Sequence, residues 1–409
     1  MKSFYEWINY IQKFNLDTQK SNFKNVTYVA KKLGISKLNT FIYIVGGTNG
    51  KGTTCYVLET ILLKHGYKVG LYTSPHLLRY TERIRINGCE LNKSLYVASF
   101  IDIERVRGAL PLTCYDFMTL SALYLFKNSQ LDVVILEVGL GGRFDATNIV
   151  TPNISVITNV DLDHIDILGS NRHLISMEKI GILRNNKIAI ISEKKLPKIA
   201  KKIIKKNKVK VRLVNRDWFY KKYDTTWSFI NNDYYCLNLP LPQVPLINVA
   251  TALAAVSESK ISLKNFIIKN CLKNFFIPGR FQIVSCYPKI ILDVAHNGHA
   301  ANYLLKKLVN MKRIGKIYVI IGVLREKNIF KIITPLISII DFWYCVKLKT
   351  HRSINPEEMA QYLPNNSYEV CVSLEDAWNK VQGFVNVNDI ILIYGSFFAV
   401  REMYKILKI

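Results

Sequence analysis

The segment that decides the fold reads Phe41-Ile-Tyr-Ile-Val-Gly-Gly-Thr-Asn-Gly-Lys-Gly-Thr-Thr54: β-branched and aromatic residues, then glycines, one lysine and hydroxyls. Backbone N–H groups can bend around an anion where residues lack a Cβ, and Gly47, Gly50 and Gly52 meet that need. Lys51 adds a positive charge for the β- and γ-phosphates of a nucleotide. The segment therefore predicts a phosphate-binding loop between a strand and a helix.

This loop departs from the usual pattern G-x-x-x-x-G-K-[ST] in two places. Val45 stands at the first glycine position, and Gly52 separates Lys51 from the following hydroxyl. A helix is expected over residues 53–65, ending before Gly66, with its positive N-terminus directed into the loop. The alternative is an ordinary glycine-rich turn whose lysine is solvated.

The composition is that of a globular protein with more than one domain. The chain has 409 residues, more than one hydrophobic core usually serves, and we expect two domains. It has no run of about 18 uncharged apolar residues and no signal-peptide pattern at its start, so we expect a soluble, cytoplasmic protein that binds no membrane. The eight cysteines form no C-x-x-C pair, which is typical of reduced interior cysteines.

The net charge of +26 raises the question of a nucleic-acid partner. The densest basic run, residues 194–210, has nine lysines that alternate with Ile, Ala and Val rather than with aromatic residues. We interpret the run as a solvated helix face and expect no nucleic-acid binding. A positive surface would still concentrate anionic substrates.

Strands alternate with helices along the chain, which predicts an α/β fold with mostly parallel sheets. A P-loop-type domain over residues 1–280 is expected to precede a smaller Rossmann-like domain over residues 288–409, with the boundary marked by Pro278-Gly279. Residues 211–245 are expected to form irregular strands and loops. Strands are expected at 41–45, 68–73, 131–139, 154–160, 289–295, 316–324, 341–348, 367–372 and 389–396.

Three polar side chains follow strands that neighbour the loop in the predicted sheet. Ser74, Glu137 and His164 supply a hydroxyl, a carboxylate and an imidazole, which together could hold a hard divalent cation near the γ-phosphate. Each also has an ordinary explanation: a turn cap, a partner of a buried arginine, or a satisfied core histidine. Their common position at strand ends favours the metal site.

A second glycine-rich turn, residues 139–148, contains Arg143 and Asp145 but no lysine. Asp145 could accept hydrogen bonds from a heterocycle, and Arg143 could bind a carboxylate; the alternative is a structural ion pair. In the second domain, Asp293 and His296 lie at the end of a strand and Arg280 lies just before the boundary. If the domains close over one nucleotide, these residues face the loop.

These motifs, in this order, resemble the folylpolyglutamate synthase family, a branch of the Mur-type ATP-dependent amide ligases. The resemblance covers nearly the whole chain, and residues 120–148 are especially similar to the bacterial bifunctional dihydrofolate synthase/folylpolyglutamate synthases. Ile180, Gly298 and Phe398 depart from the family's usual residues, and none of them is a proposed ligand. The matching segments are 47–53, 73–84, 136–148, 162–164, 178–179, 278–280, 293–297 and 395–397.

The resemblance implies a Mur ligase-like fold and a set of roles for individual residues. It makes Lys51, Lys179 and His296 catalytic, with Lys179 carbamylated to help hold the second of two magnesium ions. Ser74, Glu137 and His164 become magnesium ligands. Arg143, Asp145 and Tyr115 bind the acid substrate, with Asp145 at its dihydropteroate ring. The implied ATP-binding residues are Gly47, Thr48, Asn49, Gly50, Lys51, Gly52, Thr53, Asn248, Arg280 and Asp293.

The expected activity follows from the resemblance. An enzyme of this kind adds L-glutamate to dihydropteroate, and then to folates, at the cost of one ATP per amide bond and through an acyl phosphate. The alternative is a monofunctional folylpolyglutamate synthase or another Mur-type amino-acid ligase. The expected partners are these small molecules, and a monomer is the expectation.

Overall fold

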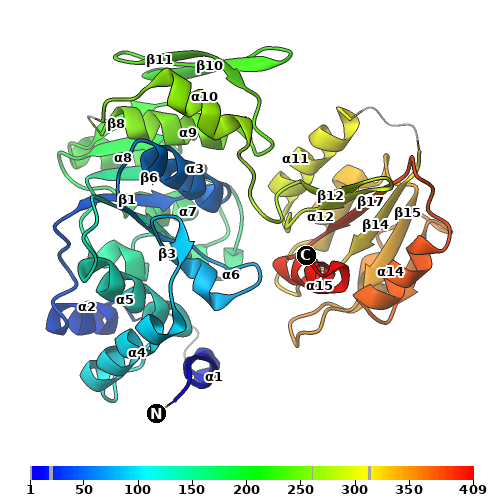
Figure 1. Cartoon of the computed structure of the whole chain (residues 1–409), viewed down its shortest axis with the longest axis horizontal. Helices are drawn as coiled ribbons and strands as arrows, with labels where there is room; N and C mark the ends of the chain where they lie inside the picture. The colour runs from blue at the N-terminus through cyan, green and yellow to red at the C-terminus, as the bar shows by residue number, and fades with distance from the viewer. Residues whose placement is uncertain (1, 18–21, 260, 312–314) are drawn as a thin grey trace. The chain divides into compact units, whose positions relative to one another are not determined.

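The structure is a computed structural model that describes residues 2–17, 22–259, 261–311 and 315–409 (Figure 1). The chain divides into two compact units, Met1–Phe275 and Phe276–Ile409, each described here by itself. The division after Phe275 lies ahead of the predicted boundary, which was placed between residues 280 and 288. Two mostly parallel sheets confirm the predicted α/β class.

The first unit is built on an eight-stranded sheet of order β4-β3-β2-β5-β1-β6-β7-β8. Strand β1 (Phe41–Gly46) lies between β5 (Val133–Glu137) and β6 (Ile154–Ile157) and is parallel to both, so their carboxyl ends meet at one edge. The other strands are β2 (Val69–Tyr72), β3 (Ile84–Ile86), β4 (Cys89–Glu90), β7 (Ile188–Ile191) and β8 (Lys210–Leu213).

Helices cover both faces of this sheet (Figure 1). On one face α3 (Lys51–Lys64) packs with α9 (Leu246–Ser257) and α10 (Asn265–Lys273). The other face carries α1 (Phe4–Asp17), α2 (Phe23–Lys32), α4 (Lys93–Arg107) and α5 (Cys114–Lys127). The remaining helices are α6 (Ile165–Leu168), α7 (Arg172–Ile180) and α8 (Lys198–Lys206), with short 3-10 turns at Tyr80–Arg83 and Ala146–Ile149.

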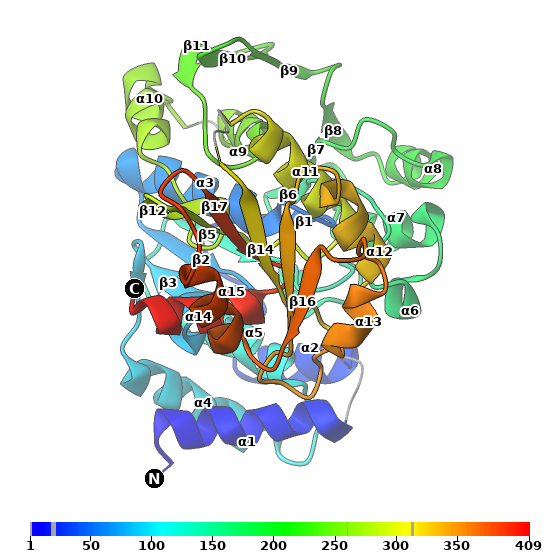
Figure 2. The same ribbon diagram turned by 90° about the vertical axis from the view of Figure 1, so that its right-hand side faces the viewer.

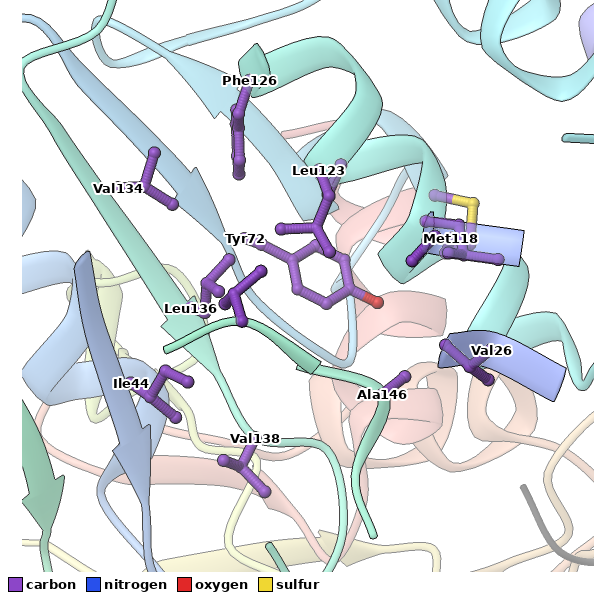
Figure 3. Close-up of a cluster of buried hydrophobic side chains, with 14 of the residues drawn as sticks. Val26, Ile44, Tyr72, Met118, Leu123, Phe126, Val134, Leu136, Val138 and Ala146 are labelled. Carbon is purple, nitrogen blue, oxygen red and sulfur yellow. The ribbon is translucent and has the colours of Figure 1, made fainter. Parts of the chain in front are cut away.

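The core under α5 shows how strand alternation divides the apolar residues between the two faces. Ile44 of β1 and Leu136 of β5 point toward α5, where Leu123 lies beside Tyr72 of β2 (Figure 3). The buried hydroxyl of Tyr72 accepts a hydrogen bond from Thr119 Oγ1 at 3.1 Å, so this phenol is paired within the core. Strand β1, which leads into the phosphate loop, is thereby buried on both faces.

Two local features of the first unit differ from the sequence-based expectations. Helix α3 begins at Lys51 rather than at residue 53, because Gly50 takes a left-handed conformation (φ +83°) and its carbonyl already accepts from Thr54 N at 2.9 Å. Residues 218–240 form a regular antiparallel sheet, β9 (Trp218–Lys222), β10 (Thr226–Asn231) and β11 (Tyr235–Pro240), instead of irregular strands. A register shift between Trp227 and Phe229 disrupts the alternation by which a strand is recognised.

The lysine run around α8 has the expected form of a solvated helix face. All nine lysines of residues 194–210 are exposed. Ala200 is buried, and Ile203 and Ile204 pack against the core of the first unit. In the described part of the chain, no helix has the length and apolar character needed to cross a membrane.

The second unit is a six-stranded sheet of order β12-β13-β17-β14-β15-β16, parallel except for the edge strand β12 (Gln282–Cys286). Figure 2 shows β14 (Ile317–Ile321), β15 (Phe342–Val346) and β16 (Tyr368–Cys371) side by side. Strands β13 (Lys289–Leu292) and β17 (Ile390–Tyr394) complete the sheet. Its helices are α11 (Gly298–Val309), α12 (Ile329–Ile333), α13 (Pro356–Ala360), α14 (Leu374–Gln382) and α15 (Phe397–Leu407).

Candidate active site

The loop between β1 and α3 is tight enough that two of its glycines cannot be replaced without strain. Gly47 has φ +143°, and a Cβ there would lie 1.8 Å from Thr158 Oγ1. Gly50 has φ +83°, and a Cβ there would lie 2.3 Å from Oδ1 of Asn248 on α9. The loop therefore requires glycine at both positions, for conformation and for space.

The loop is held in place from the end of β6. Asn159 Oδ1 accepts hydrogen bonds from the backbone N–H groups of Thr48 (3.2 Å) and Asn49 (2.8 Å). Thr158 Oγ1 donates to Asn49 O at 2.7 Å. The sequence analysis missed both supporting residues; their position directly after a strand beside β1 was the only available signal.

Lys51 lies at the first position of α3 with its side chain turned back over the loop. Its Nζ donates to Gly47 O at 3.1 Å and to Thr48 O at 3.2 Å. Thr53 is buried two residues further along the helix. The lysine charge and the free N–H groups of the first turn of α3 thus lie together at the end of the central strand, an arrangement suited to an anion.

Glu137 and Ser74 meet at the start of the same helix. Glu137, buried at the end of β5, accepts from Ser74 N at Oε2 over 2.9 Å. A Cβ on Gly52 would lie 3.3 Å from the same Oε2, so the carboxylate is packed against the first turn of α3. The structure therefore brings together two of the three predicted metal ligands beside the phosphate loop.

His164 is the third predicted ligand and lies on a less buried segment. It precedes α6 with φ +50°, and its side chain is 39% exposed. Its Nε2 is 3.9 Å from Oδ1 of Asp163. Among the described residues, no three His, Cys, Asp or Glu side chains gather in a metal-binding group. A carboxylate and a hydroxyl beside an anion loop, with an imidazole at the start of α6 after the neighbouring strand β6, still fit the donor chemistry of a hard cation.

Lys179 is buried on α7, and the sequence alone made it unremarkable. Burial lowers its pKa to about 7, and the nearby charge of Lys51 acts in the same direction, whereas Asp163 opposes the shift. Because the charge of Lys51 affects this pKa, the amine lies within electrostatic reach of the phosphate loop. A lysine with such a pKa is about half uncharged at neutral pH, and the uncharged amine is nucleophilic.

Asp145 organises the second glycine-rich turn from within. Its buried carboxylate accepts from Gly139 N (3.0 Å), Leu140 N (3.1 Å), Thr147 N (2.9 Å) and Thr147 Oγ1 (2.6 Å). Tyr115 OH donates to it at 3.0 Å. Burial raises the pKa of Asp145, and these hydrogen bonds oppose the increase. Its role toward a heterocycle stays a prediction; in this structure its partners are donors of the turn and of α5.

Arg143 lies on the outside of the same turn. Its guanidinium lies 5.0 Å from the centre of the Phe144 ring, and Phe144 is 53% exposed. Phe23 of α2 meets Phe144 edge to face, with ring centres 6.2 Å apart. The sequence analysis did not single out this aromatic pair, because Phe23 comes from a distant segment. It adds a planar apolar surface beside Asp145.

In the second unit, the predicted residues cluster at the end of β13. The buried carboxylate of Asp293 accepts from Phe281 N and Ala295 N, both at 2.7 Å, and burial raises its pKa while the charge of Arg280 opposes this. Arg280 and His296 both lie against the Phe397 ring of α15, at 5.4 Å and 6.0 Å between centres. The strand end thus holds a carboxylate, a guanidinium and an imidazole on one small surface.

Comparison with known proteins identifies the family of the chain. The family model described as "Mur ligase middle domain" matches residues 45–257, and that of the "Mur ligase, glutamate ligase domain" matches residues 279–397. A dihydrofolate synthase/folylpolyglutamate synthase of Buchnera aphidicola subsp. Baizongia pistaciae is 52% identical over 99% of this chain and 95% of its own length. The Escherichia coli K12 protein of the same name is 42% identical over 98% and 94%.

Solved structures show the same similarity over both units. E. coli FolC in complex with DHPP and ADP has a TM-score of 0.96 at 41% identity, covering 100% of this chain and 98% of that one. A Yersinia pestis bifunctional folylpolyglutamate synthase/dihydrofolate synthase, complexed with AMPPNP and a Mn ion, has a TM-score of 0.94 at 39% identity, covering 100% and 99%. The chain therefore belongs to the Mur ligase family, among the dihydrofolate synthase/folylpolyglutamate synthases.

Proposed function

We propose that this protein joins L-glutamate to dihydropteroate, forming dihydrofolate, and then to the γ-carboxylate of folates, with one ATP consumed for each amide bond. The observation that carries the proposal is the phosphate loop with Lys51 turned over it and Glu137 at the start of its helix. Membership of an ATP-dependent family of glutamate ligases supports it.

The reaction has to solve one chemical problem: a carboxylate is a poor electrophile. Transfer of the γ-phosphoryl group from ATP to a carboxylate oxygen of the acceptor gives an acyl phosphate and ADP. The amine of glutamate then attacks the acyl carbon, which forms the C–N bond and a tetrahedral intermediate. The nitrogen loses a proton, and the C–O bond to phosphate breaks as the carbonyl re-forms. Catalysis of such transfers depends on positioning and on stabilising negative charge.

The first unit supplies the charge stabilisation. Lys51 and the first-turn N–H groups of α3 would bind the β- and γ-phosphates, with Gly47–Thr53 as the cradle and Asn248 packed against Gly50. Ser74, Glu137 and His164 would hold one Mg²⁺, and a carbamate on Lys179 would help hold a second. Bound magnesium would neutralise phosphate charge.

The glycine-rich turn would bind the acceptor. The exposed Phe144 ring offers a face on which a planar heterocycle can stack, and Arg143 lies beside it to bind a carboxylate. Asp145 and Tyr115 hold the turn in the conformation that presents these groups. Asp145 would bind a heterocycle N–H only by sharing an oxygen that already accepts hydrogen bonds.

The second unit would contribute the residues that cluster at the end of β13. Arg280 and Asp293 are proposed to bind ATP, and His296 to act beside the reacting groups. Asp293 is preorganised by two backbone donors, and the His296 ring lies against the Phe397 ring, which the Arg280 guanidinium also contacts. Monomeric state and cytoplasmic location remain expectations.

The test is a product assay with purified protein, ATP, magnesium, glutamate and either dihydropteroate or tetrahydrofolate, followed by mass analysis of the products. We expect a mass increase of one glutamate on both acceptors and an equal amount of ADP. Product from tetrahydrofolate alone would favour a monofunctional folylpolyglutamate synthase. Product from neither acceptor, with the protein folded, would overturn the proposal.

Lys51→Ala supplies the matched variant. Loss of the loop charge should reduce glutamate-dependent ADP release by about 10³-fold or more, with little change in thermal unfolding because Lys51 is partly exposed. Lys64→Ala, at the other end of the same helix, is the control and should retain parental turnover. Near-normal turnover of Lys51→Ala would refute its role.

A further inference from the structure

The glycine-rich turn (residues 139–148) is packed directly on the end of α7, the helix that carries Lys179. Arg143 N donates to Glu178 O at 2.8 Å, one residue before Lys179. A Cβ on Gly142 would lie 2.8 Å from that same carbonyl oxygen, and a Cβ on Gly181 would lie 2.4 Å from Arg143 Cβ. Two glycines, one on each segment, therefore permit a backbone approach that no larger residue would allow.

Asn148 joins the two segments through its side-chain amide. Its Nδ2 donates to Arg143 O at 2.9 Å within the turn and to Gly181 O at 3.2 Å just after α7. A single buried amide group thus satisfies one carbonyl from each segment. Loss of these donors would remove a hydrogen bond from each of two partly buried carbonyls, which is costly.

Arg184 completes the connection from the α7 side. Its Nη2 donates to Asn148 Oδ1 (2.7 Å), Asn148 O (3.0 Å) and Val150 O (3.3 Å), and its Nη1 donates to Gly181 O and Leu183 O (both 3.3 Å). Across the described residues, no carboxylate forms an ion pair with it. Arg184 is partly buried, and a cation held by neutral oxygens alone is costly to desolvate, so its planar array of donors must serve the geometry of the two segments.

We propose that Asn148 and Arg184 are positioning residues that keep the acceptor-binding turn in register with the Lys179 end of α7. The inference rests on the proposed function of the Arg143 and Lys179 side chains, and Asn148 holds Arg143 through its backbone carbonyl. Because transfer requires the acid and the phosphoryl group to be aligned within a fraction of an ångström, a small shift between the two segments slows the reaction.

Arg184→Lys and Asn148→Asp separate the two halves of this connection. Lysine keeps the charge but cannot span five oxygens. Aspartate keeps an acceptor for Arg184 but loses the donors to Arg143 O and Gly181 O. Arg216→Lys is the control, because Arg216 is an exposed arginine paired with its neighbour Asp217.

Steady-state kinetics give the first readout. We expect both variants to raise KM for dihydropteroate by about fivefold or more and lower kcat by about tenfold, with KM for ATP within about twofold of the parent. A merely destabilised protein would lose kcat and keep both KM values. That pattern, or parental kinetics in both variants, would overturn the inference.

Hydrogen exchange of the ligand-free protein gives a second readout that does not depend on activity. In Arg184→Lys, amides of the turn 139–148 and of the segment 176–184 should exchange faster together, while other segments and the Arg216→Lys protein stay at parental rates. Faster exchange in only one of the two segments, or in neither, would overturn the inference. An inactive parent would overturn the proposed function instead, and exchange would still decide whether the segments are coupled.

Discussion

Lys179 of the metal-free protein should react with dissolved CO₂ at neutral pH. Its pKa is lowered to about 7, first by burial and then by the charge of Lys51, against the opposing effect of Asp163. About half of the amine is then neutral at pH 7, whereas an ordinary lysine with a pKa of about 10.4 is neutral in roughly one molecule in 2500. Only the neutral amine attacks CO₂, so its reactive fraction is raised roughly a thousandfold.

The assay is carbon NMR of bicarbonate-depleted protein after addition of ¹³C-bicarbonate without divalent metal. The lone pair of Nζ forms a bond to the carbon of CO₂ and a proton is released, which leaves a carbamate with its own carbonyl signal. We expect one signal that increases as the pH rises through about 7, where the lysine loses its proton. The signal should be absent from Lys179→Arg and present in Lys205→Arg, a change on the exposed face of α8.

Three outcomes would refute the reasoning. The parent could give no carbamate signal between about pH 6 and 9. The signal could persist in Lys179→Arg, which would assign it to another amine. Its midpoint could lie near the ordinary lysine pKa, which would mean that burial does not depress the pKa of Lys179 in solution.

Three further changes test other parts of the structure. Gly50→Ala places a Cβ 2.3 Å from Asn248 Oδ1 at φ +83°, and should raise KM for ATP by about tenfold or more, checked by nucleotide titration. Burial raises the pKa of Glu59 to about 7; because this exceeds the unfolded value, ionising Glu59 lowers stability as pH rises from about 4.5 through 7. Urea unfolding at pH 5 and 8 should therefore show that the free energy of unfolding of Glu59→Gln, relative to the parent, is about 1–3 kcal/mol more favourable at pH 8 than at pH 5. The same difference between variant and parent at both pH values would contradict this. Tyr115→Phe removes the donor to Asp145 (3.0 Å) and an acceptor for Gly139 N (2.8 Å). The substitution should lower the free energy of unfolding by about 1–2 kcal/mol and raise KM for dihydropteroate. Unchanged stability and unchanged KM would exclude this role of Tyr115.

Much of the fold was visible in the sequence because parallel strands buried on both faces are continuous apolar runs. Strand β1 and the glycines after it could be predicted from residues 41–54 alone. The three-stranded sheet at 218–240 could not, because successive buried residues around the register shift in β10 obscure the alternation of faces. The start of α3 was misplaced because a glycine N-cap leaves no side-chain signal.

The sequence by itself determined the chemistry that is local: the glycines and lysine of the phosphate loop, and polar residues at strand ends such as Ser74 and Glu137. Local spacing encodes these, because a turn's conformation and a strand's end depend on a few adjacent residues. Only the tertiary structure decided that Lys179 is a buried, easily deprotonated amine, because its pKa depends on burial and on Lys51, which lies far away in sequence. The same holds for Arg184 and Asn148, whose hydrogen bonds join segments 36 residues apart.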